Sequence, residues 1–380
     1  MKIVIAPDSY KESLTAKQVC HAIETGFKRT LPNATYISVP VADGGEGTVQ
    51  SLVDATQGRI VNTQVTGPLG NQVDAFYGFL GNSPATAVIE MAAASGLHHV
   101  TTTLRDPTKT TSYGTGELIK QALNQGAKKL IIGLGGSATN DGGLGMMSAL
   151  GVRFINSDGV GVASTGEGLK HIQDIDISQL DARLRECQIL VACDVDNPLC
   201  GEQGASAIFG PQKGATPECV KFLDQGLAHY SERIKHCLGI DVKNKPGAGA
   251  AGGMGAALMA FTNVTLKPGI ELVLETVKLE SYMQDVDLVI TGEGRIDGQT
   301  AYGKTPMGVA QVAKKYNIPV IGIAGCLGEN YQQVYQCGID AVFAATPGAM
   351  SLTQALQNAE QNVTNLAQNI AQLWAVKLSR

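Results

Sequence analysis

Residues 2–41 read KIVIAPDSYKESLTAKQVCHAIETGFKRTLPNATYISVPV, and this stretch decides the class of fold. Residues 2–6 are a short apolar run that ends at a proline, as a buried strand often does. A capping box of Thr15 and Gln18 then opens a helix. Its apolar positions recur at helical spacing: Val19, Ala22, Ile23 and Phe27. With a second strand at 35–41, the strand–helix–strand order predicts a parallel sheet.

The middle of the chain has a different pattern. Between residues 60 and 100, alternating polar and apolar residues are interrupted by Gly-Pro and Gly-Asn turns, which predicts antiparallel strands. The α/β pattern then returns, with a helix at 115–126 and strands at 129–133, 189–193, 286–291, 318–324 and 340–344. We therefore predict a two-domain α/β protein. Residues 1–60 and 282–380 form a discontinuous, Rossmann-like or flavodoxin-like domain with a parallel sheet, and residues 61–281 form an inserted second, mixed α/β domain.

Composition excludes several classes of function. The net charge is −5, and no Lys/Arg cluster offers a face for nucleic-acid phosphates. No apolar run approaches the roughly 20 residues of a membrane span, and the N-terminal apolar stretch is too short for a signal peptide. The eight cysteines form no Cys-x-x-Cys pair, which disfavours zinc sites and disulfides. We expect a cytoplasmic protein that binds neither nucleic acid nor membrane.

Loops after the predicted strands carry glycine together with ionisable side chains. The carboxyl ends of parallel strands share one edge of a sheet, where α/β proteins bind ligands. Asp8 and Lys11 follow the first strand, and we predict catalytic roles for both. We predict Asp43, Glu46 and Glu293 as Mg²⁺ ligands, because hard cations take carboxylate oxygens. The alternative for Asp8 and Asp43 is that they cap the helices that follow.

Further charged candidates lie later in the chain. The stretch TGEGRIDGQTAYGKTP at 291–306 contains Arg295, a candidate catalytic cation, and Lys304, a candidate phosphate ligand. Asp194 directly follows a buried strand and is a candidate general base or metal ligand. Lys213, in a loop rich in glycine and proline, is a second candidate phosphate ligand.

The richest loop is GLGGSATNDGG, residues 133–143. Its backbone amides are suited to phosphate groups. The residues that we predict to bind the phosphates of a nucleotide are Gly135, Gly136, Ser137, Thr139 and Asn140. Loops that mix acids with cations fit a nucleoside triphosphate with Mg²⁺, because phosphoryl transfer needs metal ligands, charge neutralisation and a base.

Two glycine motifs favour other interpretations. Residues 298–305 (GQTAYGKT) match the Walker A expression, but about six residues separate them from the predicted strand end, so we expect a coincidence. Residues 133–138, with Asp158 further on, match a dinucleotide-binding pattern. An NAD-dependent hydroxy-acid dehydrogenase is therefore the alternative enzyme. The non-enzymatic alternative is a two-domain sensor that closes on a ligand, although a sensor needs only one such set of polar loops.

The C-terminal segment 352–376 has an apolar seam with alternating spacings of four and three. Its members are Leu352, Leu356, Ala359, Val363, Leu366, Ile370 and Leu373. A coiled-coil homodimer is one interpretation of this seam. The more common one is a terminal helix that packs on its own domain.

Ten segments in order resemble the bacterial glycerate kinase type I family. They are APDSYKESLTA (6–16), VADGGEGT (41–48), EMAAASGL (90–97), DPTKTTSYGTGELI (106–119), GLGGSATNDGGLGM (133–146), ACDVDNPL (192–199), FGPQKGA (209–215), GAGAAGGMGAAL (247–258), TGEGRID (291–297) and GKTP (303–306). The resemblance covers the whole chain. It implies two α/β domains and ATP-dependent phosphorylation of D-glycerate, with Mg²⁺. The relatives that the chain resembles most are glycerate 2-kinases of glyoxylate and aldarate breakdown, and formation of 3-phosphoglycerate is the alternative.

Overall fold

A computed structural model describes residues 1–378, which separate into two compact units. The first unit contains Met1–Asp43, Gln50–Gly58 and the chain from Pro268 onward, and the second contains Gly44–Val49 and Arg59–Lys267. Both ends of the chain thus belong to one unit, as a discontinuous domain requires. The first unit resumes earlier than the predicted residue 282, because helix α9 (Gly269–Thr276) packs against helix α10 (Thr305–Lys314). The boundaries of independently folding domains stay a prediction.

The sheet of the first unit is parallel throughout, with the strand order β13-β12-β11-β1-β2. Its strands are β1 (Lys2–Ile5), β2 (Thr35–Ser38), β11 (Leu288–Ile296), β12 (Val320–Leu327) and β13 (Ala341–Ala344). From β1 the chain moves to one side, to β2, and from β11 it moves to the other side, to β12 and β13. The direction of winding therefore changes between β1 and β11. In open α/β sheets ligands bind beside the carboxyl ends of strands at such a change.

Strand β11 differs from the sequence-based prediction. The expected strand ended at Thr291 and a glycine-rich loop followed, but the strand continues to Ile296. Arg295 and Ile296 pair with Cys326 and Leu327 of β12, so the partner strand supplies the hydrogen bonds that keep this segment extended. Glu293 and Arg295 are consequently strand residues and not loop residues.

Helices complete the first unit. They are α1 (Ala16–Lys28), α2 (Thr48–Thr56), α9, α10, α11 (Leu352–Gln357) and α12 (Ala359–Leu378), with short 3-10 turns η6 (Leu279–Tyr282), η7 (Gly298–Ala301) and η8 (Tyr331–Cys337). Helix α1 begins at the predicted capping box of Thr15 and Gln18. Helix α2 contributes its first residues, up to Val49, to the second unit.

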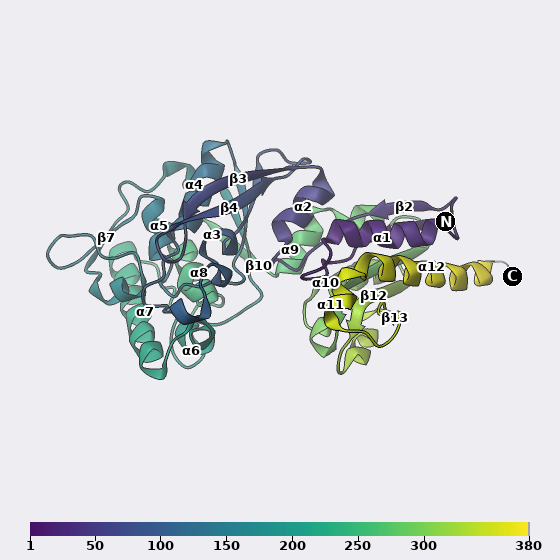
Figure 1. Ribbon diagram of the computed structural model, residues 1–380. Helices are drawn as coiled ribbons and strands as arrows, with labels where there is room; N and C mark the ends of the chain where they lie inside the picture. The colour runs from purple at the N-terminus through teal and green to yellow at the C-terminus, as the bar shows by residue number, and fades with distance from the viewer. Residues whose placement is uncertain (379–380) are drawn as a thin grey trace. The chain divides into compact units, whose positions relative to one another are not determined.

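The C-terminal helix packs within its own unit. Helices α1 and α12 lie side by side (Figure 1), and a Cβ at Gly26 of α1 would meet Thr364 and Ala367 of α12. The buried positions of α12 are Ala359, Val363, Ala367, Ile370 and Ala371. The predicted seam is wrong at its two ends, since the side chains of Leu352 and Leu373 are 73% and 66% exposed. Because the buried part of the seam contacts the same chain, it is not available for a coiled coil, and a homodimer through another surface stays a prediction.

The second unit contains a six-stranded mixed sheet with the order β10-β9-β6-β5-β4-β3. The strands are β3 (Arg59–Thr66), β4 (Gln72–Phe79), β5 (Thr86–Glu90), β6 (Lys129–Gly133), β9 (Gln188–Ala192) and β10 (Val264–Lys267). As predicted for residues 60–100, β3, β4 and β5 are joined by antiparallel pairing, and the remaining pairs are parallel. A separate two-stranded sheet consists of β7 (Arg153–Ile155) and β8 (Asp174–Asp176).

Helices pack on this sheet around one large core. They are α3 (Ala92–Ser95), α4 (Tyr113–Asn124), α5 (Leu144–Ala149), α6 (Ala205–Phe209), α7 (Pro217–Leu238) and α8 (Ala250–Phe261), with 3-10 turns η1 (Leu97–His99), η2 (Thr102–Leu104), η3 (Gly166–His171), η4 (Ala182–Arg185) and η5 (Pro211–Lys213). Within residues 1–378, no helix is long and apolar enough to cross a membrane.

Candidate active site

Asp8 lies at the change of winding in the first unit, directly after β1. Its Oδ1 accepts a hydrogen bond from the Ser9 N–H at 2.6 Å, and its Oδ2 accepts one from the Thr305 hydroxyl at 2.6 Å. Thr305 is the first residue of α10, the helix that follows β11. The carboxylate of Asp8 thus comes from the segment after β1 and the hydroxyl of Thr305 from the segment after β11, the two strands that flank the change of winding. Burial, with a contribution from the nearby charge of Asp43, raises the pKa of Asp8 to about 7.

Glu293 is the second partly buried carboxylate of this region. Its Oε1 accepts a hydrogen bond from the Thr300 hydroxyl at 2.6 Å, and its Oε2 lies 3.5 Å from the Lys304 ammonium group. Burial raises the pKa of Glu293 although these two partners lower it, and the charge of Asp43 raises it further. The structure therefore brings together three of the predicted acids, Asp8, Asp43 and Glu293, beside one of the predicted cations.

Two predicted catalytic groups of the first unit are exposed. Lys11 lies on the surface of the segment that leads from β1 to α1. Arg295 also points to solvent, and its Nε lies 3.2 Å from Oδ2 of Asp297. The side chains of Lys11 and Arg295 are not held in place by burial, and their catalytic roles stay predictions.

The acids of the first unit fit a magnesium ion that is also bound by other ligands. Among residues 1–378, no group of three His, Cys, Asp or Glu side chains is arranged to hold a metal ion by itself. Yet the carboxylates of Asp43 and Glu293 are close enough to Asp8 to raise its pKa, and a cation would relieve this repulsion. Mg²⁺ usually binds one or two carboxylates together with substrate phosphates and water. The residues therefore fit a cation that arrives with a nucleotide.

The Walker-like stretch 298–305 is positioned differently from our expectation. Because β11 continues to Ile296, Gly298 follows the strand after a single residue, and α10 begins at Thr305. The spacing argument for a coincidence was therefore wrong. The segment is nevertheless not an open loop, since η7 occupies residues 298–301 and Asp297 caps it.

In the second unit, the glycine-rich loop 133–143 follows β6 as predicted. Gly135 and Gly136 are exposed, and Gly136 has a φ of +75°, a left-handed conformation that glycine adopts without strain. Ser137, Thr139 and Asn140 are buried. The loop thus presents backbone at its tip and turns its polar side chains inward.

Lys213 comes from a distant part of the sequence to this loop. Its side chain is 1% exposed, and its Nζ donates to Ser137 Oγ at 2.7 Å and to the Thr139 carbonyl oxygen at 2.6 Å. Burial lowers the pKa of Lys213 to about 7, while the charge of Asp141 raises it. The structure thus joins this predicted phosphate ligand with the loop that we predicted to bind phosphates.

Asp141 fixes the far end of the loop. Its carboxylate accepts hydrogen bonds from the Ser112 N–H and hydroxyl and from the N–H groups of Gly143 and Gly145. Burial raises the pKa of Asp141, and these donors oppose the shift. The loop also packs against the left-handed break in α8, where a Cβ at Gly252 (φ +68°) would collide with the Thr139 carbonyl oxygen.

Glu46 and Asp194, the remaining predicted acids, lie elsewhere in the second unit. Glu46 is exposed, and its charge acts on Glu90 and His98. Glu90, the last residue of β5, binds the N-terminus of α2: its carboxylate accepts a hydrogen bond from the Val49 N–H at 2.7 Å. Asp194 is an exposed residue after β9. Its role as base, and the role of Glu46 as a metal ligand, stay predictions.

Comparison with known proteins identifies the family. A model of the glycerate kinase family matches residues 3–375. The chain belongs to the glycerate kinase family. It is 57% identical to a glycerate 2-kinase of Escherichia coli K12, over 99% of this chain and 98% of the relative, and 56% identical to a glycerate kinase of Haemophilus influenzae, over 99% and 100%. A crystal structure assigned as glycerate kinase 2 of Salmonella typhimurium LT2 superimposes with a TM-score of 0.93, at 55% identity, covering all of both chains.

The dehydrogenase alternative has no support in this structure. A dinucleotide fold places the acidic residue that binds the ribose near the end of the next parallel strand. Asp158 instead lies exposed in the connection between β7 and β8, where its N–H bonds to Asn156 Oδ1. The family match also favours an enzyme over the sensor alternative.

Sequence reasoning missed several partners of the site. Thr300 and Thr305, which bind Glu293 and Asp8, belong to the Walker-like stretch that we set aside, and that match was the available signal. Ser112, which binds Asp141, and Tyr10, whose hydroxyl donates to the Ile323 carbonyl oxygen at 2.7 Å, lie in segments that carry the family resemblance, but no local pattern indicated these contacts. Their roles depend on contacts between distant parts of the sequence.

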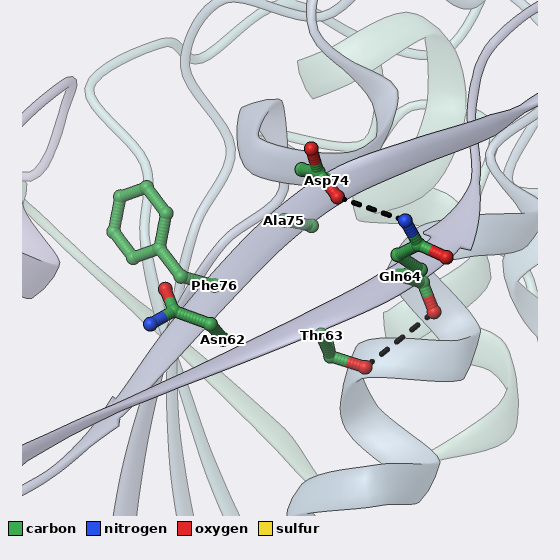
Figure 2. A pocket seen from close by; sticks show the side chains of 6 residues that line it. All are labelled: Asn62, Thr63, Gln64, Asp74, Ala75 and Phe76. Carbon is green, nitrogen blue, oxygen red and sulfur yellow. Dashed lines mark hydrogen bonds between the residues drawn. The ribbon is translucent and has the colours of Figure 1, made fainter.

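One hollow lies in the second unit. Figure 2 shows it on the β3–β4 hairpin, lined by Asn62, Thr63, Gln64, Asp74, Ala75 and Phe76. Its side chains are mostly polar, and Gln64 bonds to Asp74 at 3.1 Å. It contains no predicted site residue, so we assign no function to it.

Proposed function

We propose that this protein transfers the γ-phosphate of ATP to the 2-hydroxyl group of D-glycerate, forming 2-phospho-D-glycerate and ADP. The observation that carries the proposal is the end-to-end likeness to the glycerate 2-kinase of Escherichia coli, at 57% identity. The glycine-rich loop and the buried acids agree with phosphoryl transfer, which needs charge neutralisation and a base more than covalent chemistry.

The second unit supplies the groups that we assign to the ATP phosphates. The exposed backbone at Gly135 and Gly136 is suited to anionic oxygens, and Ser137 follows directly. Thr139 and Asn140, the other predicted phosphate ligands of the loop, are buried behind this tip. In the first unit, Lys304 carries the positive charge nearest to the buried acids and is assigned to a phosphate oxygen.

The first unit supplies the proton acceptor. Asp8 is desolvated, with a pKa raised to about 7, so its carboxylate is able to accept a proton near neutral pH. In the proposed step the proton of the glycerate hydroxyl moves to Asp8 Oδ while the hydroxyl oxygen bonds to phosphorus and ADP leaves. Asp194 remains the alternative base, and Lys11 and Arg295 are assigned to the substrate carboxylate or to phosphate.

A magnesium ion bound to ATP would lie at Asp43 and Glu293, where it would neutralise phosphate charge. Glu46 is its third predicted ligand. We also propose a cytoplasmic location, where ATP is available and where the eight cysteines, all free thiols, stay reduced.

A coupled assay tests the function and the position of phosphorylation together. Purified protein is mixed with ATP, Mg²⁺, D-glycerate and enolase, and phosphoenolpyruvate formation is followed by absorbance without phosphoglycerate mutase. We expect a signal with enolase alone, which identifies 2-phosphoglycerate. A signal only after mutase is added would identify 3-phosphoglycerate, and the absence of glycerate-dependent ADP would contradict the kinase function.

A further inference from the structure

The burial of Lys213 is exceptional for a lysine. Lysine side chains are almost never fully buried without a charged partner. Here the ammonium group lies 2.7 Å from Ser137 Oγ and 2.6 Å from the Thr139 carbonyl oxygen, both neutral acceptors. One side chain thus ties the glycine-rich loop at two points, on either side of Ala138. A group buried to this extent acts on a ligand through its neighbours.

The direction of the bond to Ser137 follows from chemistry. An ammonium group only donates hydrogen bonds, so Ser137 Oγ is the acceptor. The hydroxyl proton of Ser137 is then left to donate to another group. Ser137 comes directly after Gly135 and Gly136, the exposed tip of the loop. A phosphate oxygen bound at this tip is a suitable acceptor.

We propose that Lys213 is a positioning residue that acts through Ser137: it fixes the loop and leaves the serine hydroxyl as a donor to a phosphate oxygen of ATP. This inference rests on the proposed kinase function. It differs from the direct phosphate contact that the sequence predicted for Lys213, because the ammonium group is enclosed and already bonded to the loop.

Two unpaired atoms in the same loop support a polar ligand. Thr139 Oγ1 and Asn140 Oδ1 are buried and have no hydrogen-bond partner among the described residues. Buried polar atoms are rarely left unsatisfied in proteins, because each costs about 1–3 kcal/mol. A bound polar group, with the water that accompanies it, would satisfy them.

The charges around Lys213 make the arrangement sensitive to pH. The charge of the Asp141 carboxylate acts on Lys213 and on Tyr230, and Arg105 donates from Nη1 to the carbonyl oxygen of Gln212, next to Lys213. Burial lowers the pKa of Lys213 to about 7. Above this pH the neutral amine is able to accept the Ser137 proton, which withdraws the donor from phosphate. Binding of ATP should therefore weaken as the pH rises from 7 to 9.

A double-mutant cycle tests the proposal. Ser137→Ala, Lys213→Met and the double variant are compared with the wild type for kcat, KM for ATP and KM for D-glycerate between pH 6 and 9. Ser231→Ala, which removes a buried serine hydroxyl of α7 bonded to Ala228, is the matched control. We expect each single variant to raise KM for ATP about tenfold, with KM for D-glycerate within about twofold. The double variant should be no worse than Lys213→Met, because one residue acts through the other.

Multiplied effects in the double variant would overturn the proposal, since they would mean two independent contacts. An unchanged KM for ATP with only a lower melting temperature would also overturn it, by reducing Lys213 to a structural role. If Lys213→Met does not fold, Ser137→Ala alone decides, because it must abolish the pH dependence of KM for ATP that the wild type shows above pH 7. A wild type without glycerate-dependent ADP formation is a different result, which contradicts the kinase function itself.

Discussion

Replacing Asp8 with asparagine measures the energetic cost of a buried carboxylate at the candidate site. Burial, the charge of Asp43 and, to a smaller extent, that of Glu293 raise the pKa of Asp8 from 3.8 to about 7. One pKa unit corresponds to about 1.4 kcal/mol, so the ionised side chain lowers the free energy of unfolding by up to about 4 kcal/mol. This penalty is absent below about pH 3, where both folded and unfolded chains hold the proton. It grows as the pH rises toward 7 and then stays constant.

The asparagine variant keeps the shape of the side chain and removes its charge. Its single amide oxygen accepts from the Ser9 N–H or from the Thr305 hydroxyl but not from both, which costs about 1–3 kcal/mol at every pH. The absolute stability of the variant is therefore less informative than its dependence on pH.

Urea unfolding of both proteins at pH 5, 6, 7 and 8, without ligand, gives this dependence. Relative to the wild type, we expect the free energy of unfolding of Asp8→Asn to rise by about 2–3 kcal/mol from pH 5 to pH 8. Asp74→Asn, which removes an exposed carboxylate on β4, is the control. Turnover of Asp8→Asn should fall at least about 100-fold if Asp8 accepts the proton. A stability difference that is the same at all four pH values would refute the reasoning.

Three further substitutions test other parts of the structure. Asp194→Asn should lower turnover about 100-fold if Asp194 is the base, and wild-type turnover of this variant would leave that role to Asp8. Burial raises the pKa of Glu90 although the N–H groups at the start of α2 lower it, so its ionised carboxylate reduces stability as the pH rises. Relative to the wild type, the melting temperature of Glu90→Gln should therefore be higher at pH 8 than at pH 4, and a difference that does not change with pH would contradict this. Gly252→Ala should lower the free energy of unfolding by more than about 2 kcal/mol, because the added Cβ collides with the Thr139 carbonyl oxygen. Gly239→Ala, at a similar φ but with open space around the added Cβ, should lower it by about 1 kcal/mol. Equal costs would exclude the collision.

Local patterns in the sequence predicted much of the fold. The capping box of Thr15 and Gln18 begins α1, and the strand at 129–133 has the same bounds in the structure. These elements are decided by neighbouring residues, through helix capping and short apolar runs. The end of β11 is decided by pairing with β12, and its glycine-rich sequence therefore indicated a loop where the structure has a strand.

The candidate site was predictable in its residue types but not in its contacts. Glycine and polar residues after β6 indicated a ligand-binding loop, and Lys213 was recognised as a candidate cation. Its burial was not predictable, because the sequence around it is polar and its partner Ser137 lies 76 residues away. The pairing of Asp8 with Thr305 joins residues 297 positions apart, so only the assembled sheet reveals it.

The central position of β1 has a consequence for synthesis of the protein. Ala6, just after β1, is bonded to Thr291 of β11, 285 residues later in the chain. A ribosome completes residues 59–267 before β11 emerges, so the nascent chain can assemble the second unit while β1 still lacks one neighbour. Domains generally fold as units during translation, and contacts between distant residues form slowly. One edge of the apolar strand at the N-terminus thus lacks its partner until β11 has been translated, and during this period it is open to pairing with other chains.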